Sequence, residues 1–236
     1  MTHSGKSSCT VLNPLIAAAI ACACMAAPAH AITLGQLDDF QDTMTGDWDN
    51  GGAAPGPENL GGGPLGAADR FMRINADGSG AGGKLTIFSR ERWIGDYITP
   101  GVTAIEMDLR NFSSQSLSIR IAMKQSTSIA GAGYSSTVAY VLPNDGRWHR
   151  ATFSLSSSAL TRLGTIQGTL TDVLSGGENG AREFRILHSN NPSLGGSSIT
   201  GQLGIDNIRA VPGPSAATLM ALVGIIACRR HRRALV

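Results

Sequence analysis

Apolar and polar residues alternate with a period of two in the middle of the chain. Ile105, Met107 and Leu109 alternate with charged residues, and a second run of the same kind covers 117–124. This period gives an extended strand one apolar face and one polar face. The short polar segment 111–116 joins the two runs, which are therefore predicted to form an antiparallel hairpin.

Further strands are predicted near 70–75, 84–89, 137–142, 148–155, 182–188 and 203–210, and a short helix at 157–163. Pro143 to Gly146 is a strong turn signal between two of these strands. The 30 glycines and the charged fraction of only 15% favour tight turns over long helices. The predicted fold is all-β, a two-sheet antiparallel β-sandwich of the jelly-roll kind, with 46–66 as a long surface loop.

The first 31 residues have the layout of a secretory signal peptide. Lys6 supplies a positive region, 15–25 is an apolar run, and Ala29-His30-Ala31 is a small-x-small cleavage pattern. We therefore expect a signal helix over 1–31, removed on export, followed by an ectodomain over 32–210. A buried helix of the domain, or a lipoprotein modified at Cys22, is the alternative.

The last 26 residues are predicted to be a membrane tail. Val211, Pro212, Gly213, Pro214 and Ser215 precede an apolar run over 216–228, and Arg229, Arg230, Arg232 and Arg233 follow it. These arginines would stay cytoplasmic and leave the domain outside. The order of the three parts resembles the PEP-CTERM sorting signal, although Gly213 replaces the usual glutamate. The resemblance implies removal of the tail by an exosortase and release to the cell surface or exopolysaccharide matrix. A single-span anchor that is never cleaved is the alternative.

The charge and the cysteine positions limit the functions that the predicted ectodomain over 32–210 can have. Residues 32–210 hold 17 acidic and 14 basic side chains, a net charge of 14 − 17 = −3, which gives no footprint for nucleic acid. All four cysteines lie in the two end segments, so the domain has neither a disulfide nor a thiolate site. We find no nucleophile elbow and no histidine pair at metal-binding spacing, and expect no enzyme.

The middle resembles the galactose-binding-like β-sandwiches common among carbohydrate-binding modules. The matching pieces are Leu37-Asp38-Asp39-Phe40, the segment 66–74, and the closing segment 203–208. Related sandwiches often hold a structural Ca²⁺ between their first and last strands, and the resemblance implies Asp39 and Asp206 as ligands, with Asp42 as a third. From the residues alone, Asp206 beside Ile208 has to bind a cation or accept hydrogen bonds from strand-edge amides.

Aromatic residues near predicted loops are candidate sugar contacts. Trp93 and Tyr97 lie beside Arg92 and Asp96, which combines flat rings with polar groups that pair with hydroxyls. The alternative is that the rings pack in the core. The sequence thus favours an exported, non-catalytic, glycan-binding surface or matrix protein. A purely structural or adhesive matrix protein, or a secreted glycan hydrolase or lyase, stays open.

Overall fold

The computed structural model describes residues 32–52, 55–79, 83–126 and 131–212. The predicted signal peptide and the predicted span over 216–228 lie outside these residues. Within the described ranges, no helix has the length and apolar character needed to cross a membrane. The described residues belong to the predicted ectodomain, which begins at the fully buried Ile32, and to the first two positions of the predicted tail.

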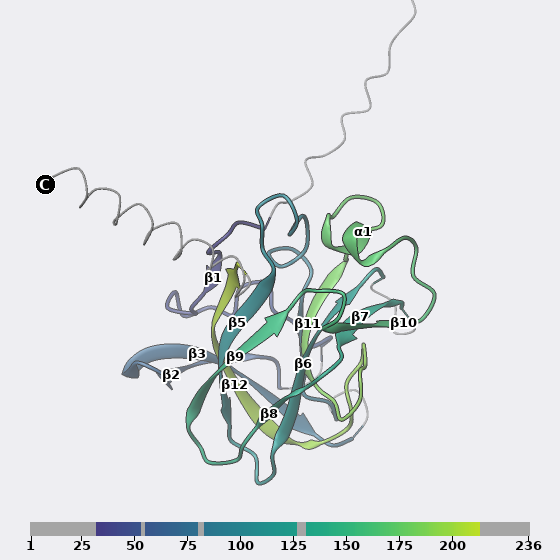
Figure 1. Cartoon of the computed structure of the whole chain (residues 1–236). Helices are drawn as coiled ribbons and strands as arrows, with labels where there is room; N and C mark the ends of the chain where they lie inside the picture. The colour runs from purple at the N-terminus through teal and green to yellow at the C-terminus, as the bar shows by residue number, and fades with distance from the viewer. Residues whose placement is uncertain (1–31, 53–54, 80–82, 127–130, 213–236) are drawn as a thin grey trace, which may run out of the picture.

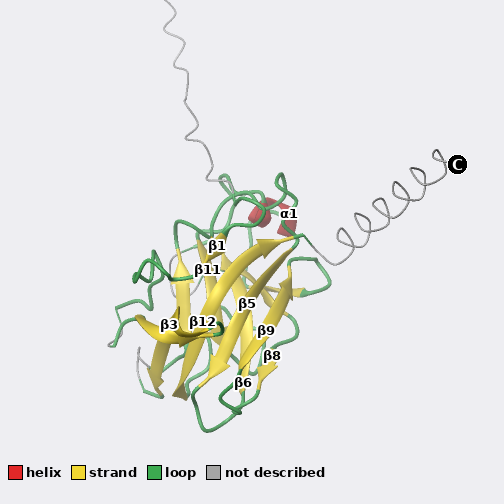
Figure 2. Cartoon of the chain, turned by 90° about the vertical axis from the view of Figure 1, so that its left-hand side faces the viewer, coloured by secondary structure: helices red, strands yellow, loops and turns green. Residues whose placement is uncertain are grey.

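Two antiparallel sheets form the molecule, as the alternating pattern predicts. In the described part of the chain the first sheet has the strand order β2-β3-β12-β5-β9, with β1 paired to the far end of β12. In Figure 2 this sheet faces the viewer. Its strands are β1 (Leu37–Asp38), β2 (Glu58–Gly63), β3 (Gly66–Asp77), β5 (Ala104–Asn111), β9 (Trp148–Ser154) and β12 (Thr200–Val211).

The second sheet has the order β10-β7-β6-β11-β4, with β8 also paired to β6. Its strands are β4 (Thr86–Ser89), β6 (Leu117–Lys124), β7 (Gly133–Ser136), β8 (Tyr140–Leu142), β10 (Leu160–Leu163) and β11 (Glu183–His188). Apolar side chains from both sheets fill the space between them, so the predicted β-sandwich is confirmed. Each predicted strand overlaps an observed one, and the end of the predicted 46–66 loop is strand β2.

The predicted hairpin is wrong, because β5 and β6 belong to different sheets. Strands β12 and β9 occupy both edges of β5, so no edge is left for β6. The segment 111–116 instead crosses from one sheet to the other. Asn111, only 1% exposed, holds this corner by donating from Nδ2 to the carbonyls of Gln115 (2.8 Å) and Leu142 (3.3 Å).

The predicted helix at 157–163 is also wrong. Its second half is strand β10, which pairs with β7 at the edge of the second sheet. Among the described residues, the α-helix is α1 (Leu170–Leu174), which begins with a capping box formed by Thr169 and Asp172. The spacing of Leu160 and Leu163 fits a helical period, but pairing with the edge of β7 makes this segment a strand.

The polar side of β6 is buried instead of facing solvent. Arg120 is 4% exposed and donates to four backbone carbonyls, including those of Ser136 (2.6 Å) and Ser189 (2.9 Å). Lys124, on the same side, has no exposed surface. The segment after β11 supplies two of these carbonyls, from Ser189 and Asn190, and the end of β7 supplies the other two, from Ser136 and Thr137. This coverage closes much of the outer face of the second sheet.

Candidate functional site

A groove of about 680 Å³ lies on the outer face of the first sheet. Its floor is the surface of β5, β9 and the bulged part of β12, and one wall is the turn between β2 and β3. Figure 1 shows this hairpin projecting beside the sheet. The groove is lined by Pro64, Leu65, Glu106, Asp108, Trp148, Arg150, Asn207 and Arg209.

Aromatic rings build the apolar end of the groove. Trp148 packs edge-on against Phe71, with ring centroids 5.1 Å apart, and Phe71 stacks on Phe112 at 5.8 Å. These rings lie over Gly204, where an added Cβ would come within 3.1 Å of Trp148 and 2.9 Å of Phe112. The absence of a side chain there lets the rings lie directly on the sheet.

The rim on this side is also apolar. Leu65, at the tip of the β2–β3 turn, is 87% exposed. The turn is tied to the opposite strand because the Trp148 indole donates from Nε1 to the Gly62 carbonyl (3.3 Å). The exposed Leu65 and the indole of Trp148 therefore lie together on one side of the groove.

The polar floor of the groove is formed by charged and amide side chains that pair with one another. Arg150 donates from Nε to Oδ1 of Asp108 (3.2 Å), and its side chain is 67% exposed. Asn207 donates from Nδ2 to Oδ2 of Asp108 (2.9 Å). Thr152 donates to Glu106 (3.3 Å). These hydrogen bonds hold the polar side chains of the groove in position without a ligand.

Asp206 of β12 lies opposite Asp108 of β5 and has no exposed surface. Its Oδ1 accepts the backbone N–H of Asn207 (2.7 Å), a residue with a φ of 50° at the bulge of β12. Burial is the main cause that raises the pKa of Asp206 to about 7. Repulsion from the carboxylates of Asp69, Asp108 and Asp39 adds to the rise.

The predicted calcium ligands are brought together only in part. Asp39 acts on Asp206 through its charge, whereas Asp42 is exposed and accepts the Met44 N–H (3.0 Å). In the ranges that the structure describes, no group of three or more Asp, Glu, His or Cys side chains is placed to hold a metal ion. The hydrogen bonds of Asp206 fit the amide-capping alternative, and a bound calcium stays a prediction.

The prediction that Trp93 and Tyr97 stack on a sugar is wrong. Trp93 and Tyr97 have no exposed surface, because Trp93 donates from Nε1 to the buried Asp38 (2.7 Å) and the Tyr97 hydroxyl donates to the Trp93 carbonyl. The alternative, core packing, is what the structure shows. Arg92 forms an ion pair with Asp38 (2.7 Å), and Asp96 accepts the N–H groups of residues 98 and 99.

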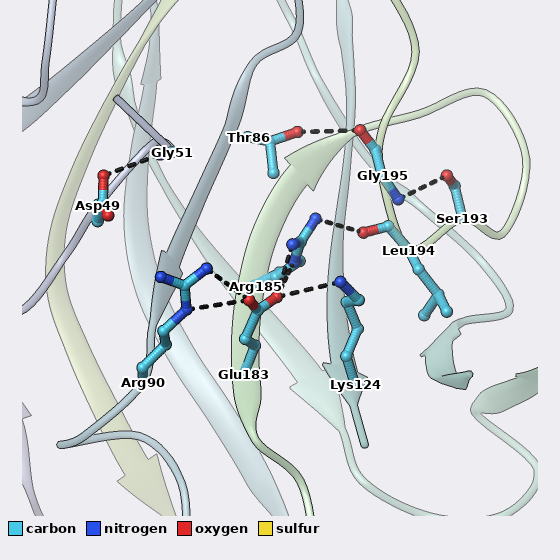
Figure 3. Close-up of polar contacts among 10 residues, drawn as sticks. All are labelled: Asp49, Gly51, Thr86, Arg90, Lys124, Glu183, Arg185, Ser193, Leu194 and Gly195. Carbon is cyan, nitrogen blue, oxygen red and sulfur yellow. Dashed lines mark hydrogen bonds and ion pairs between the residues drawn. The ribbon is translucent and has the colours of Figure 1, made fainter. Parts of the chain in front are cut away.

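A cluster of charges lies on the outer face of the second sheet (Figure 3). The Glu183 carboxylate accepts hydrogen bonds from Arg90 (2.8 Å), Lys124 (3.2 Å) and Arg185 (2.8 Å). Burial alone would raise the pKa of Glu183, but the bonds from the arginines outweigh it and hold the pKa below its usual value. Arg185 also donates to the Leu194 carbonyl (2.9 Å), which fastens the covering loop. Because Glu183 and Lys124 are fully buried, this cluster serves the fold.

The sequence carried a partial signal for the groove. Glu106 and Asp108 stand out as the polar side of an alternating strand, and Trp148 and Arg150 follow the turn signal at 143–146. Leu65 and Asn207 come from segments far away in the sequence, and no periodic pattern joins them to the strand. Of the predicted tail, Val211 pairs in β12 and Pro212 is exposed, while Gly213 to Ser215 and the four arginines lie outside the described residues.

We compared the chain with protein families, curated proteins and solved structures, and only solved structures are similar to it. No protein-family model matches the chain, so the sorting-signal resemblance stays a prediction. No curated protein matches it either. The chain is similar to the family 11 carbohydrate-binding module from Clostridium thermocellum in complex with a β-1,3-1,4-mixed-linked tetrasaccharide, at 16% identity over 78% of this chain and 98% of that chain, with a TM-score of 0.44.

Two other solved structures have a similar level of likeness. The CBM22-1 xylan-binding domain from Paenibacillus barcinonensis Xyn10C has 10% identity over 78% of this chain and 99% of that chain (TM-score 0.43). An agarase has 15% identity over 77% of this chain and 24% of that chain (TM-score 0.48). These values are too low to assign a ligand to this chain, which has to be inferred from its own groove.

Proposed function

We propose that this chain is an exported, non-catalytic glycan-binding protein of the cell surface or extracellular matrix. Its signal peptide and C-terminal tail would place the sandwich outside the cytoplasm, held at the membrane until an exosortase-type enzyme cleaves the tail. The observation that supports glycan binding is the groove on the first sheet, which combines apolar side chains with fixed polar groups.

The chemistry of this groove suits a sugar chain. A pyranose presents C–H faces to apolar side chains and hydroxyls to charged and amide groups. Leu65 and Trp148 offer the apolar contacts, and Arg150 and Asn207 offer donors beside the carboxylate of Asp108. The polar groups are already held by one another, so little ordering is required when a ligand binds. The groove lies on an open sheet face, which gives a polymer room to run along it.

Substitutions at the rim test this proposal. Arg150→Ala should weaken binding of the retained polysaccharide about tenfold, because it removes a charged donor worth about 1.5 kcal/mol. The matched control is Arg182→Ala, which removes an exposed arginine outside the groove. Leu65→Ala, with Val141→Ala as its exposed apolar control on the second sheet, tests the other rim. Binding is measured by depletion of the detergent-solubilised chain onto the polysaccharide.

The outcomes separate the alternatives. Equal binding by Arg150→Ala, Leu65→Ala and their controls would remove the groove from the proposal. Release of reducing ends from a polysaccharide, lost in Glu106→Gln, would replace it with a glycan hydrolase. The absence of saturable binding to any polymer would favour the structural or adhesive matrix protein.

A further inference from the structure

The last strand leads directly into the predicted sorting motif. Val211, the first residue of that motif, pairs with Ala104, and its carbonyl accepts the Thr103 N–H (3.1 Å). The motif therefore begins inside the sheet and not on a linker. This fixes the point on the domain from which the tail departs.

Only residues 212–215 separate this point from the apolar run predicted to span the membrane. Four residues of extended chain reach at most about 14 Å. With the tail inserted, as the proposed function requires, the end of the sandwich that carries Val211 must lie close to the lipid surface. The chain is too short to let the domain stand away from the bilayer.

This end of the sandwich carries exposed apolar side chains. Leu34 is 50% exposed and Ile98 is 46% exposed. Leu34 lies beside the end of β12, because Gly35 donates to the Ala210 carbonyl (2.8 Å). The segment of Ile98 is joined to the same region, because the Asp96 carbonyl accepts the Ile32 N–H (3.1 Å) and Thr103 donates to the Val211 carbonyl. Figures 1 and 2 place β1 and α1 at this same end.

A groove of about 670 Å³ runs from Ile98 towards α1. Its lining is mixed: the half-buried Leu170 and buried leucines lie beside polar residues that include Arg162 and Thr169. At the opposite end, the turn between β8 and β9 exposes the polar residues Asn144, Asp145 and Arg147, with the exposed Val141 beside them. Apolar side chains gathered on one exposed surface mark an interaction site.

We propose that this end of the sandwich, formed by residues 33–35, 98–101 and the groove beside α1, docks on the lipid surface of the membrane that the tail enters. Leu34 and Ile98 enter the interfacial layer, while β12 brings the chain to the bilayer at the same point. The precursor is then held in one orientation, with the glycan-binding groove on its side and the 143–147 turn pointing away from the membrane.

Fluorescence quenching by lipid-borne quenchers tests this orientation. All four native cysteines lie outside residues 32–210, so with all four replaced by serine the full chain accepts a single new cysteine label. Labels are placed by Leu34→Cys, by Ile98→Cys and, as the matched control, by Asn144→Cys. The full chain is reconstituted in phosphatidylethanolamine–phosphatidylglycerol vesicles that carry doxyl-labelled lipid. We expect loss of fluorescence at positions 34 and 98 and an unchanged signal at 144.

Alkaline carbonate extraction distinguishes the two proposals. A chain that resists extraction but shows equal quenching at 34, 98 and 144, or none at all, overturns the docking surface and leaves the proposed anchoring intact. A chain that carbonate releases contradicts the anchoring and, with it, the docking surface. Binding to polysaccharide is a separate measurement that neither result changes.

Discussion

Replacing Glu183 with glutamine is expected to lower the free energy of unfolding by about 3–5 kcal/mol, because it leaves buried cations without a countercharge. Glu183 is the carboxylate that Arg90, Lys124 and Arg185 share, and Lys124 is itself fully buried. Burial, aided by the neighbouring Arg185 charge, already lowers the pKa of Lys124. Urea unfolding followed by tryptophan fluorescence measures the loss.

The control is Glu178→Gln, at an exposed carboxylate only five residues away, which should change the stability by less than about 0.5 kcal/mol. Combining Lys124→Met with Glu183→Gln should cost less than the sum of the two single changes, because the pair is lost together. A single Glu183→Gln variant as stable as its Glu178 control would show that the cluster does not hold the second sheet together.

Asp206→Asn is expected to stabilise the protein at pH 8 by up to about 4 kcal/mol in the presence of a chelator. A pKa of about 7 against an ordinary value of 3.8 corresponds to that amount, at about 1.4 kcal/mol for each tenfold change in proton affinity. The folded state holds this proton more tightly than the unfolded chain does. The stabilising contribution of Asp206 is therefore complete below about pH 4 and is lost as the pH rises through 7.

Unfolding curves from pH 4 to pH 8 measure this effect, and the variant should show the flatter dependence. Asp77→Asn is the control, because the Ser79 N–H lowers the pKa of that exposed carboxylate and no gain at pH 8 is expected. Added calcium also tests the predicted cation, since it should raise the stability of the natural chain at pH 8 and leave Asp206→Asn unchanged. A variant less stable than the natural chain at pH 8, with chelator present, would contradict the repulsion that we infer around Asp206.

The sequence pattern was sufficient to predict eight strands and the sandwich, but it missed β1, β2, β7 and β10 and did not give the pairing. Alternation at 104–111 and 117–124 specifies which side of each strand is apolar, and it carries no information on the neighbouring strand. The edges of β5 are taken by β12 and β9, of which β12 begins 89 residues after β5 ends. The burial of Arg120 likewise depends on carbonyls about 70 residues further along the chain.

Contacts between residues far apart in the sequence also explain why the candidate site could not be predicted in full. Trp93 and its polar neighbours have the residue types of a sugar-binding site. The Trp93 indole is nevertheless buried, and it donates to the carboxylate of Asp38, 55 residues earlier in the sequence. The groove takes Leu65, Trp148 and Asn207 from three separate segments, and the bulge of β12 that presents Asn207 has no sequence signal that we recognise. Local pattern identified the polar stripe with Glu106 and Asp108, and only the tertiary fold shows that an apolar rim stands beside it.

Affinity electrophoresis of the detergent-solubilised chain tests the central claim most directly. The chain is run through native gels that contain one polysaccharide each, across neutral and acidic polymers, beside a gel without polymer. We predict that at least one polymer retards the chain and that the retardation saturates with polymer concentration. Unchanged mobility in every gel, for a chain whose urea unfolding curve shows that it is folded, would contradict the proposal that this sandwich binds glycans.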